Sequence, residues 1–209
     1  MTARNTWIMF VAAIVALAIV ITIISLDVYD FPRYSIIRGA ALLGYLSVFA
    51  TCMSSLYLRK LTQVFGRPFI KTHHIIAVCG LSLLAVHAIF NAWYAETLSV
   101  FIPRFESLRD FLAHGGRAAL ILLGIAVFAA LLRTRLGRNW RVIHWLNYLA
   151  FFIATFHAFS LGTDFRYLVV RIAALVMVCL LVFSFVMKRV QLWRLAQRRS
   201  AHSTVHSKE

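Results

Sequence analysis

The chain has little acidic charge: seven of its 209 residues are aspartate or glutamate, against 22 lysines and arginines. Cysteine and proline are also scarce, with three of each. Cys52, Cys79 and Cys179 form no C-x-x-C pair, which argues against covalent haem attachment and against a zinc site. All three lie in apolar stretches, so we expect buried structural thiols.

Polar sequence is scarce as well, and long apolar runs take its place. The chain is 62% apolar, whereas a soluble domain has about 45–50%. Runs of about 20 apolar residues are long enough to cross a bilayer. Backbone polar groups in lipid must be satisfied within the segment, so the sequence predicts an all-α, six-helix transmembrane bundle. The predicted spans are Trp7–Leu26, Ile36–Tyr57, Thr72–Tyr94, Arg117–Leu132, Ile143–Leu161 and Tyr167–Met187. They form one membrane domain, residues 1–196, followed by a polar cytoplasmic tail, residues 197–209.

Positive charge lies in alternate gaps between the predicted spans. Fifteen of the 22 basic residues fall on one side, and six of the seven acids fall on the other. Because Lys and Arg in short loops stay in the cytoplasm, both termini are predicted to be cytoplasmic in a multi-pass protein of the plasma (inner) membrane. This distribution favours membrane lipid headgroups or an acidic partner and argues against nucleic acid.

Four histidines lie in two of the apolar segments. His73 and His87 are 14 residues apart, and His144 and His157 are 13 apart. A titratable ring inside a membrane is costly unless it faces a partner, a cavity or a cofactor. The two helices begin on the same side, so His73 shares a depth with His144, and His87 shares a second depth roughly 20 Å away with His157. The pattern predicts two stacked haems, each held by one imidazole from each helix.

The angular spacing of the second pair is a difficulty for this prediction. A spacing of 14 places two residues on one helix face, whereas 13 leaves them about 140° apart, so the second pair requires a bend, a π-bulge or different ring orientations.

Three alternatives also concern these histidines. His74 is 13 residues from His87 and is the alternative to His73. The histidines would otherwise serve hydrogen bonding between helices. A di-metal centre would need carboxylates, and the interiors of these two helices have none.

The stretch LGRNWRVIHWLNYLAFFIATFH (Leu136–His157) has a basic, aromatic lead-in followed by two histidines 13 apart. With the His73–His87 spacing, Arg38-Gly39 and Arg117, it resembles the ferric-reductase-like transmembrane domain family. That family includes ferric reductases, the NADPH oxidase membrane domain and the haem subunit of the periplasmic methionine sulfoxide reductase system. The resemblance extends from about Arg38 to Met187.

The resemblance implies two b-type haems, or one if a single pair is occupied. By position, His73 would pair with His144 and His87 with His157. Iron held by two imidazoles has no open coordination position, so it would pass electrons rather than bind oxygen. Arg38 and Arg117 lie on the predicted outer side, where they would pair with haem propionates or an anionic acceptor, or else extend to the membrane surface.

Full-length ferric reductases and NADPH oxidases continue into a flavin and nicotinamide domain, but this sequence has no G-x-G-x-x-G fingerprint. We therefore expect a transmembrane oxidoreductase subunit that carries single electrons. The donor would be a cytoplasmic flavoprotein reductase or a quinol. The acceptor would be ferric iron, oxygen or a periplasmic redox partner bound to the long outer loop Ala95–Gly116. The alternative is a non-catalytic membrane anchor or assembly subunit, or a carrier of haem or metal.

Overall fold

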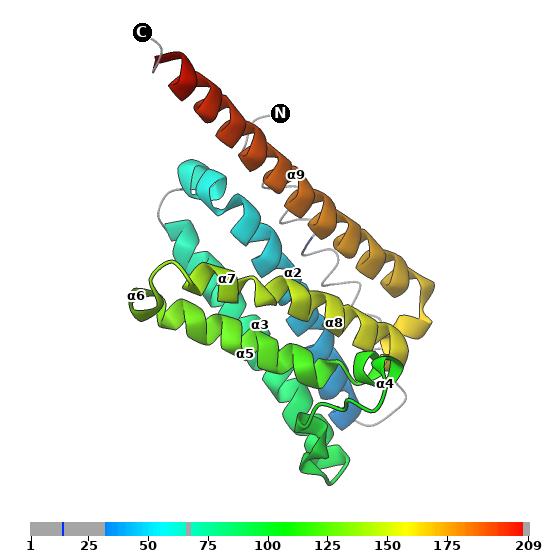
Figure 1. Ribbon diagram of the computed structural model, residues 1–209. Helices are drawn as coiled ribbons and strands as arrows, with labels where there is room; N and C mark the ends of the chain where they lie inside the picture. The colour runs from blue at the N-terminus through cyan, green and yellow to red at the C-terminus, as the bar shows by residue number, and fades with distance from the viewer. Residues whose placement is uncertain (1–13, 15–31, 66–67, 207–209) are drawn as a thin grey trace.

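The computed structural model describes residue 14, residues 32–65 and residues 68–206. The first predicted span, Trp7–Leu26, lies outside the described residues apart from residue 14. Within the described part the fold is all-helical and contains no strand (Figure 1). The α-helices are α2 (Pro32–Phe65), α3 (Pro68–Tyr94), α4 (Leu108–Ala113), α5 (Gly116–Leu131), α6 (Arg133–Leu136), α7 (Trp140–His144), α8 (Leu146–Leu161) and α9 (Leu168–His206). Two 3₁₀ helices, η1 (Leu98–Phe101) and η2 (Thr163–Arg166), lie in the connections.

Four helical stretches in the described part are long and apolar enough to cross a membrane: Ser35–Phe65, Phe69–Tyr94, Trp140–Leu161 and Leu168–Leu195. They correspond to four of the six predicted spans. A fifth prediction, Arg117–Leu132, corresponds to α5, which has 16 residues and is shorter than these four. The described chain therefore has the character of a membrane protein.

The helix starts follow the prolines. Pro32 and Pro68 are the first residues of α2 and α3. Proline is favoured at this position because the first N–H groups of a helix make no intrahelical hydrogen bond, so the missing N–H of proline costs none. The sequence places the end of α2 at Tyr57, but the helix continues to Phe65 because residues 45–65 contain no glycine or proline. Arg59 and Lys60 therefore lie on α2 and not in a loop.

The last helix is longer than predicted. The expected polar tail from residue 197 is helical as far as His206. Residues 188–206 lack glycine and proline and are rich in Arg, Gln, Leu and Ala, which favour helix. As a result, α9 extends beyond the rest of the bundle at its C-terminal end (Figure 1).

Small residues bring α2 and α3 together. A Cβ added at Gly44 would lie 2.8 Å from the side chain of Leu84, and one added at Gly80 would lie 2.7 Å from Cβ of Ser47. Such close approach of backbones is a common way for helices to associate where lipid removes the hydrophobic driving force.

A second unit is formed by α5 and α8, which pack along each other, while α9 packs against α2. Among the fully buried side chains of the described residues, the largest are those of Phe151, Leu181 and Cys52, from α8, α9 and α2. Tyr45 stacks on Phe151 with ring centroids 4.9 Å apart. This core holds α2, α8 and α9 together beside the histidines.

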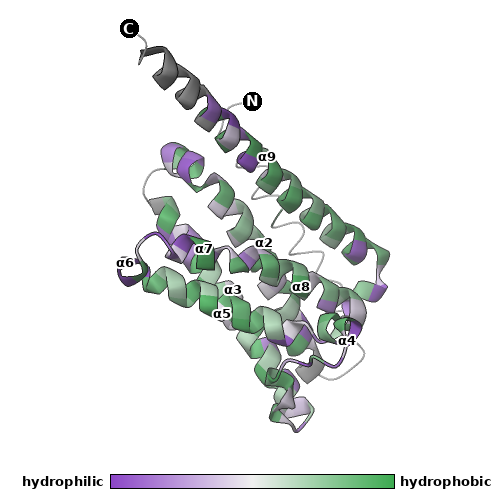
Figure 2. Ribbon diagram, viewed as in Figure 1, coloured by the Kyte–Doolittle hydropathy of each residue, from purple (hydrophilic) through white to green (hydrophobic). Residues whose placement is uncertain are grey.

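The cysteine prediction holds at one position in three. Cys52 is buried, but Cys79 and Cys179 are exposed on α3 and α9. Both lie among exposed apolar side chains such as Val78 and Leu180. Large apolar side chains are exposed on α3, α5 and α9, as expected for faces that contact lipid, and these helices are largely hydrophobic in Figure 2.

Hydrophilic residues lie toward one end of the bundle, and others lie around α4 at the opposite end (Figure 2). The first of these two ends carries the larger basic cluster. This end comprises the end of α2, α6 and the start of α7. We call it the basic end and define it by its exposed residues Arg59, Lys60, Arg133, Arg135, Arg138 and Arg141. Two of the gaps predicted to be cytoplasmic therefore meet at the same end of the molecule.

Candidate functional site

The four histidines occupy two levels along the bundle. His73 of α3 is an electrostatic neighbour of His144 of α7, and we call this pair the first level. His87 of α3 is an electrostatic neighbour of His157 of α8, and this pair is the second level. The structure therefore brings together the same pairs that the sequence predicts, with the first level nearer the basic end.

A helix break between His144 and His157 reduces the angle that a spacing of 13 residues would leave between their side chains on a regular helix. Here α7 ends at His144, α8 begins at Leu146, and Trp145 lies between them. The N–H of Trp145 donates to the carbonyl of Val142 at 3.1 Å, which is a 3₁₀ contact. Each 3₁₀ residue turns about 120° in place of about 100°, so the break recovers part of the rotation that 13 residues of regular helix lack.

At the second level, both imidazoles donate to backbone carbonyls. Nδ1 of His87 lies 3.0 Å from the carbonyl oxygen of Ile37, and Nδ1 of His157 lies 2.7 Å from that of Ala113. A carbonyl oxygen can only accept, so each ring carries its proton on Nδ1. In the neutral form this tautomer leaves the Nε2 lone pair available for a metal.

The first level reaches the same tautomer with one side-chain acceptor. Nδ1 of His144 donates to the carbonyl of Ala126 at 3.1 Å, and Nδ1 of His73 lies 2.8 Å from Oγ of Ser54. The Ser54 hydroxyl donates its own proton to the carbonyl of Thr51 at 2.9 Å. It therefore accepts from His73, which leaves Nε2 of that ring unprotonated as well.

Two asparagines, which sequence reasoning missed, lie against the rings. The amide nitrogen of Asn147 is 3.3 Å from both ring nitrogens of His144. That of Asn91 is 3.5 and 3.2 Å from Nδ1 and Nε2 of His87. Because each amide nitrogen is nearly equidistant from the two ring nitrogens, it does not lie along the Nε2 lone pair. The available signal was the spacing of three and four residues, which puts each pair on one helix face.

The donor set fits haem iron. A metal-binding histidine ordinarily donates its second ring N–H to a carbonyl or another oxygen acceptor, and all four rings do so here. Within residues 32–65 and 68–206 no group of three or more His, Cys, Asp or Glu side chains could hold a bare metal ion. Two imidazoles per iron are the complete protein ligand set of a b-type haem of this kind.

Gly116, at the start of α5, has no side chain, and the His157 ring lies where a side chain at this position would be. A Cβ at this position would lie 2.8 Å from Nε2 and 2.7 Å from Cδ2 of His157. A larger residue would push the ring away, so the glycine is part of the second level.

The structure places Arg38 differently from the sequence prediction. Its guanidinium forms a buried ion pair with Asp164 of η2, in which Nε lies 2.9 Å from Oδ1. The buried side chain does not extend to the membrane surface. Its contact with a haem propionate or an anionic acceptor stays a prediction. Asp164 is 126 residues away and carried no local signal. Arg38 directly follows Ile37, whose carbonyl oxygen accepts the hydrogen bond from Nδ1 of His87.

Arg117 stabilises the adjacent loop. Its Nη1 donates to the carbonyl of Ile102 at 2.8 Å. The contact links α5 to the loop before it, and the binding of an anion by Arg117 stays a prediction.

His74, the alternative to His73, is exposed on α3. Its ring centroid lies 5.8 Å from that of His73, which is buried and hydrogen bonded to Ser54. The geometry at the first level therefore favours His73.

No protein-family model, curated protein or solved structure matches the chain. The likeness to ferric-reductase-like membrane domains thus rests on the motif residues and their spacing alone.

Proposed function

We propose that the chain is a di-haem b-type membrane cytochrome. His73 and His144 would hold one haem iron, and His87 and His157 the other. The observation that carries the proposal is the shared tautomer: each ring donates from Nδ1 to an oxygen, so four Nε2 atoms are available in two pairs. Histidines that served only packing would not require two matched pairs in a single tautomer.

The protein's own contribution is to orient the rings and exclude water. The carbonyls of Ile37, Ala113 and Ala126 and the hydroxyl of Ser54 fix the four imidazoles. The apolar helices around them keep the site dry. When bound, haem supplies a one-electron iron couple, and ligation by two imidazoles leaves no position for direct oxygen chemistry.

The two ends of the bundle suggest the direction of transfer. The basic end would attract an acidic flavoprotein reductase as donor, with a rate that falls as salt is added. A membrane quinol is the other donor class. The acceptor at the opposite end would be ferric iron, oxygen or a periplasmic redox partner. On this account the chain is the electron-transfer subunit of an oxidoreductase in the plasma (inner) membrane.

Liposomes that contain entrapped ferricyanide test the proposal. The haem-loaded protein is reconstituted, dithionite is added outside, and the bleaching of ferricyanide is followed by absorbance. We expect bleaching well above that of protein-free liposomes, and its loss in a variant with His87→Ala and His157→Ala. A variant with His74→Ala is the matched control and should retain the rate.

Haem-loaded protein that bleaches ferricyanide no faster than empty liposomes would contradict electron transfer. That result would favour the alternative of a non-catalytic anchor subunit or a carrier of haem.

A further inference from the structure

The connection between α3 and α4 exposes large apolar side chains. Leu98 and Phe105 are each 77% exposed, and Leu108 is 75% exposed. Loops that face water are ordinarily polar, and large exposed apolar surfaces mark contact sites. We call residues 98–108 the apolar segment. Its exposed apolar residues are Leu98, Phe101, Ile102, Phe105 and Leu108.

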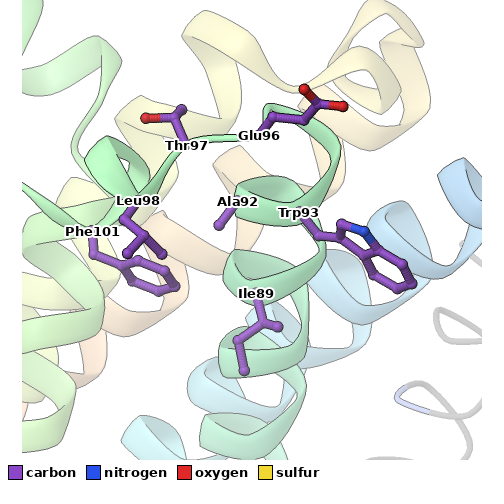
Figure 3. A pocket seen from close by; sticks show the side chains of 7 residues that line it. All are labelled: Ile89, Ala92, Trp93, Glu96, Thr97, Leu98 and Phe101. Carbon is purple, nitrogen blue, oxygen red and sulfur yellow. The ribbon is translucent and has the colours of Figure 1, made fainter.

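The apolar segment forms one side of a groove of about 410 Å³. The other side is the last turns of α3, so the groove joins a predicted membrane span to the loop that follows it. Figure 3 shows Leu98 and Phe101 beside these turns. The lining residues are Ile89, Ala92, Trp93, Glu96, Thr97, Leu98 and Phe101.

A helix-terminating turn fixes the apolar segment against α3. The N–H of Thr97 donates to the carbonyl of Ala92 at 3.1 Å, and the N–H of Glu96 donates to that of Trp93 at 3.3 Å. These two bonds form a Schellman motif, with Glu96 at a φ of 51°. The chain therefore turns back at the end of α3, and η1 lies beside the helix.

Charge does not explain what this surface binds. Residues 95–116 contain two arginines and three acidic residues, so the loop has no excess of positive charge for anionic headgroups. Apolar contact must supply the attraction. This differs from the basic end, where every residue of the defining set is a cation.

The groove continues an exposed apolar surface of α3, and this surface indicates what fills the groove. The exposed side chains of Ile75, Val78, Ile89 and Trp93 form an apolar surface along α3, and it continues into the groove. Trp93 and Tyr94 end the helix, and these residue types concentrate at the membrane–water interface. A soluble protein partner would meet a surface that is continuous with the lipid-facing side of a spanning helix.

We propose that the apolar segment lies within the lipid leaflet at the end of α3, and that lipid acyl chains fill the groove. The occupant is the bilayer and not the redox partner that the sequence assigned to this loop. The inference does not depend on haem binding or on electron transfer.

Depth-dependent quenching tests the inference. Full-length protein with Cys79→Ser and Cys179→Ser receives Phe105→Cys, which is labelled with an environment-sensitive fluorophore and placed in phosphatidylcholine nanodiscs. We expect loss of fluorescence with brominated acyl chains and little effect of aqueous iodide. The matched control is Thr134→Cys, an exposed position on α6, where iodide should quench and brominated lipid should not.

Equal quenching of both probes by iodide, with none by brominated lipid, would overturn the inference. So would loss of lipid quenching at high salt, because apolar burial is not screened by ions.

A second measurement requires no substitution. Trypsin added to the wild-type protein in nanodiscs should cleave after Arg138 in the turn before α7 and leave the bond after Arg104 intact. Cleavage after Arg104 at the same rate as after Arg138 would show that the loop is in water and would overturn the inference.

Discussion

The two histidine levels share a plan but differ in what holds the rings. At the second level both Nδ1 atoms bind backbone carbonyls, from Ile37 and Ala113. At the first level one of the acceptors is the hydroxyl of Ser54. A carbonyl is available at every residue and survives substitution, whereas a hydroxyl can be removed. The first level is therefore sensitive to a side-chain change that has no counterpart at the second.

The second level has its own dependence, on packing. Gly116 leaves space for the His157 ring, and the Arg38–Asp164 ion pair lies one residue from the Ile37 carbonyl that binds His87. Both levels therefore hold their imidazoles by hydrogen bonds from Nδ1, but the first level uses a side-chain hydroxyl and the second has a close-packed glycine and a buried ion pair beside it.

Removing both ligands of one level should have the largest effect. With His87→Ala and His157→Ala we expect the haem content to fall from two per chain to one, and likewise with His73→Ala and His144→Ala. Pyridine haemochrome assays of purified protein measure this content. If either double variant kept the full haem content, the ligand assignment at that level would be wrong.

Gly116→Ala should remove the second-level haem alone. The added methyl group would lie 2.7 Å from Cδ2 of the His157 ring, which must then shift. Gly124→Ala on the same helix is the control, because a Cβ there meets nothing within 4 Å. Redox titration followed by absorbance separates the two haems. Loss of the first-level haem instead would contradict the distinction between the levels.

Arg38→Leu should destabilise the fold through the charge that it leaves on Asp164. Breaking a buried ion pair from one side costs about 3–5 kcal/mol, whereas replacing both partners with apolar residues costs far less. We expect a lower unfolding temperature in detergent by circular dichroism, and recovery in the double variant Arg38→Leu, Asp164→Leu. A single variant as stable as the wild type would show that the pair does not stabilise the second level.

Ser54→Ala should have the smallest effect, and at the first level only. Loss of a hydrogen-bond partner of a metal-binding histidine typically weakens metal affinity about 10–100-fold. Haem titration of the apoprotein should show one weakened site. Ser55→Ala is the control, because the Ser55 hydroxyl contacts Tyr148 and no histidine. Weakening of both sites, or of neither, would contradict the role of Ser54.

Much of the fold follows from the sequence because lipid imposes a simple rule. Apolar runs of sufficient length must be helical, and four of the predicted spans correspond to long helices. Helix ends were harder to predict. The predicted spans ended with their apolar runs at Tyr57 and Met187, but without glycine or proline both helices continue into the polar residues that follow.

The site was predictable only in part. Histidine spacing identified the pairs that meet, because helical rise converts separation into depth. The carbonyls of Ile37, Ala113 and Ala126 left no trace in sequence, since any residue supplies a carbonyl. The ion pair of Arg38 with Asp164 depends on tertiary contacts that no local pattern encodes.

The measurement that tests the central claim most directly is a dithionite-reduced minus oxidised absorption spectrum of the purified wild-type protein, expressed with haem supplied, together with haem quantified per chain. The account predicts a sharp reduced α-band and about two b-type haems per chain. Protein that is folded but carries no haem would contradict it.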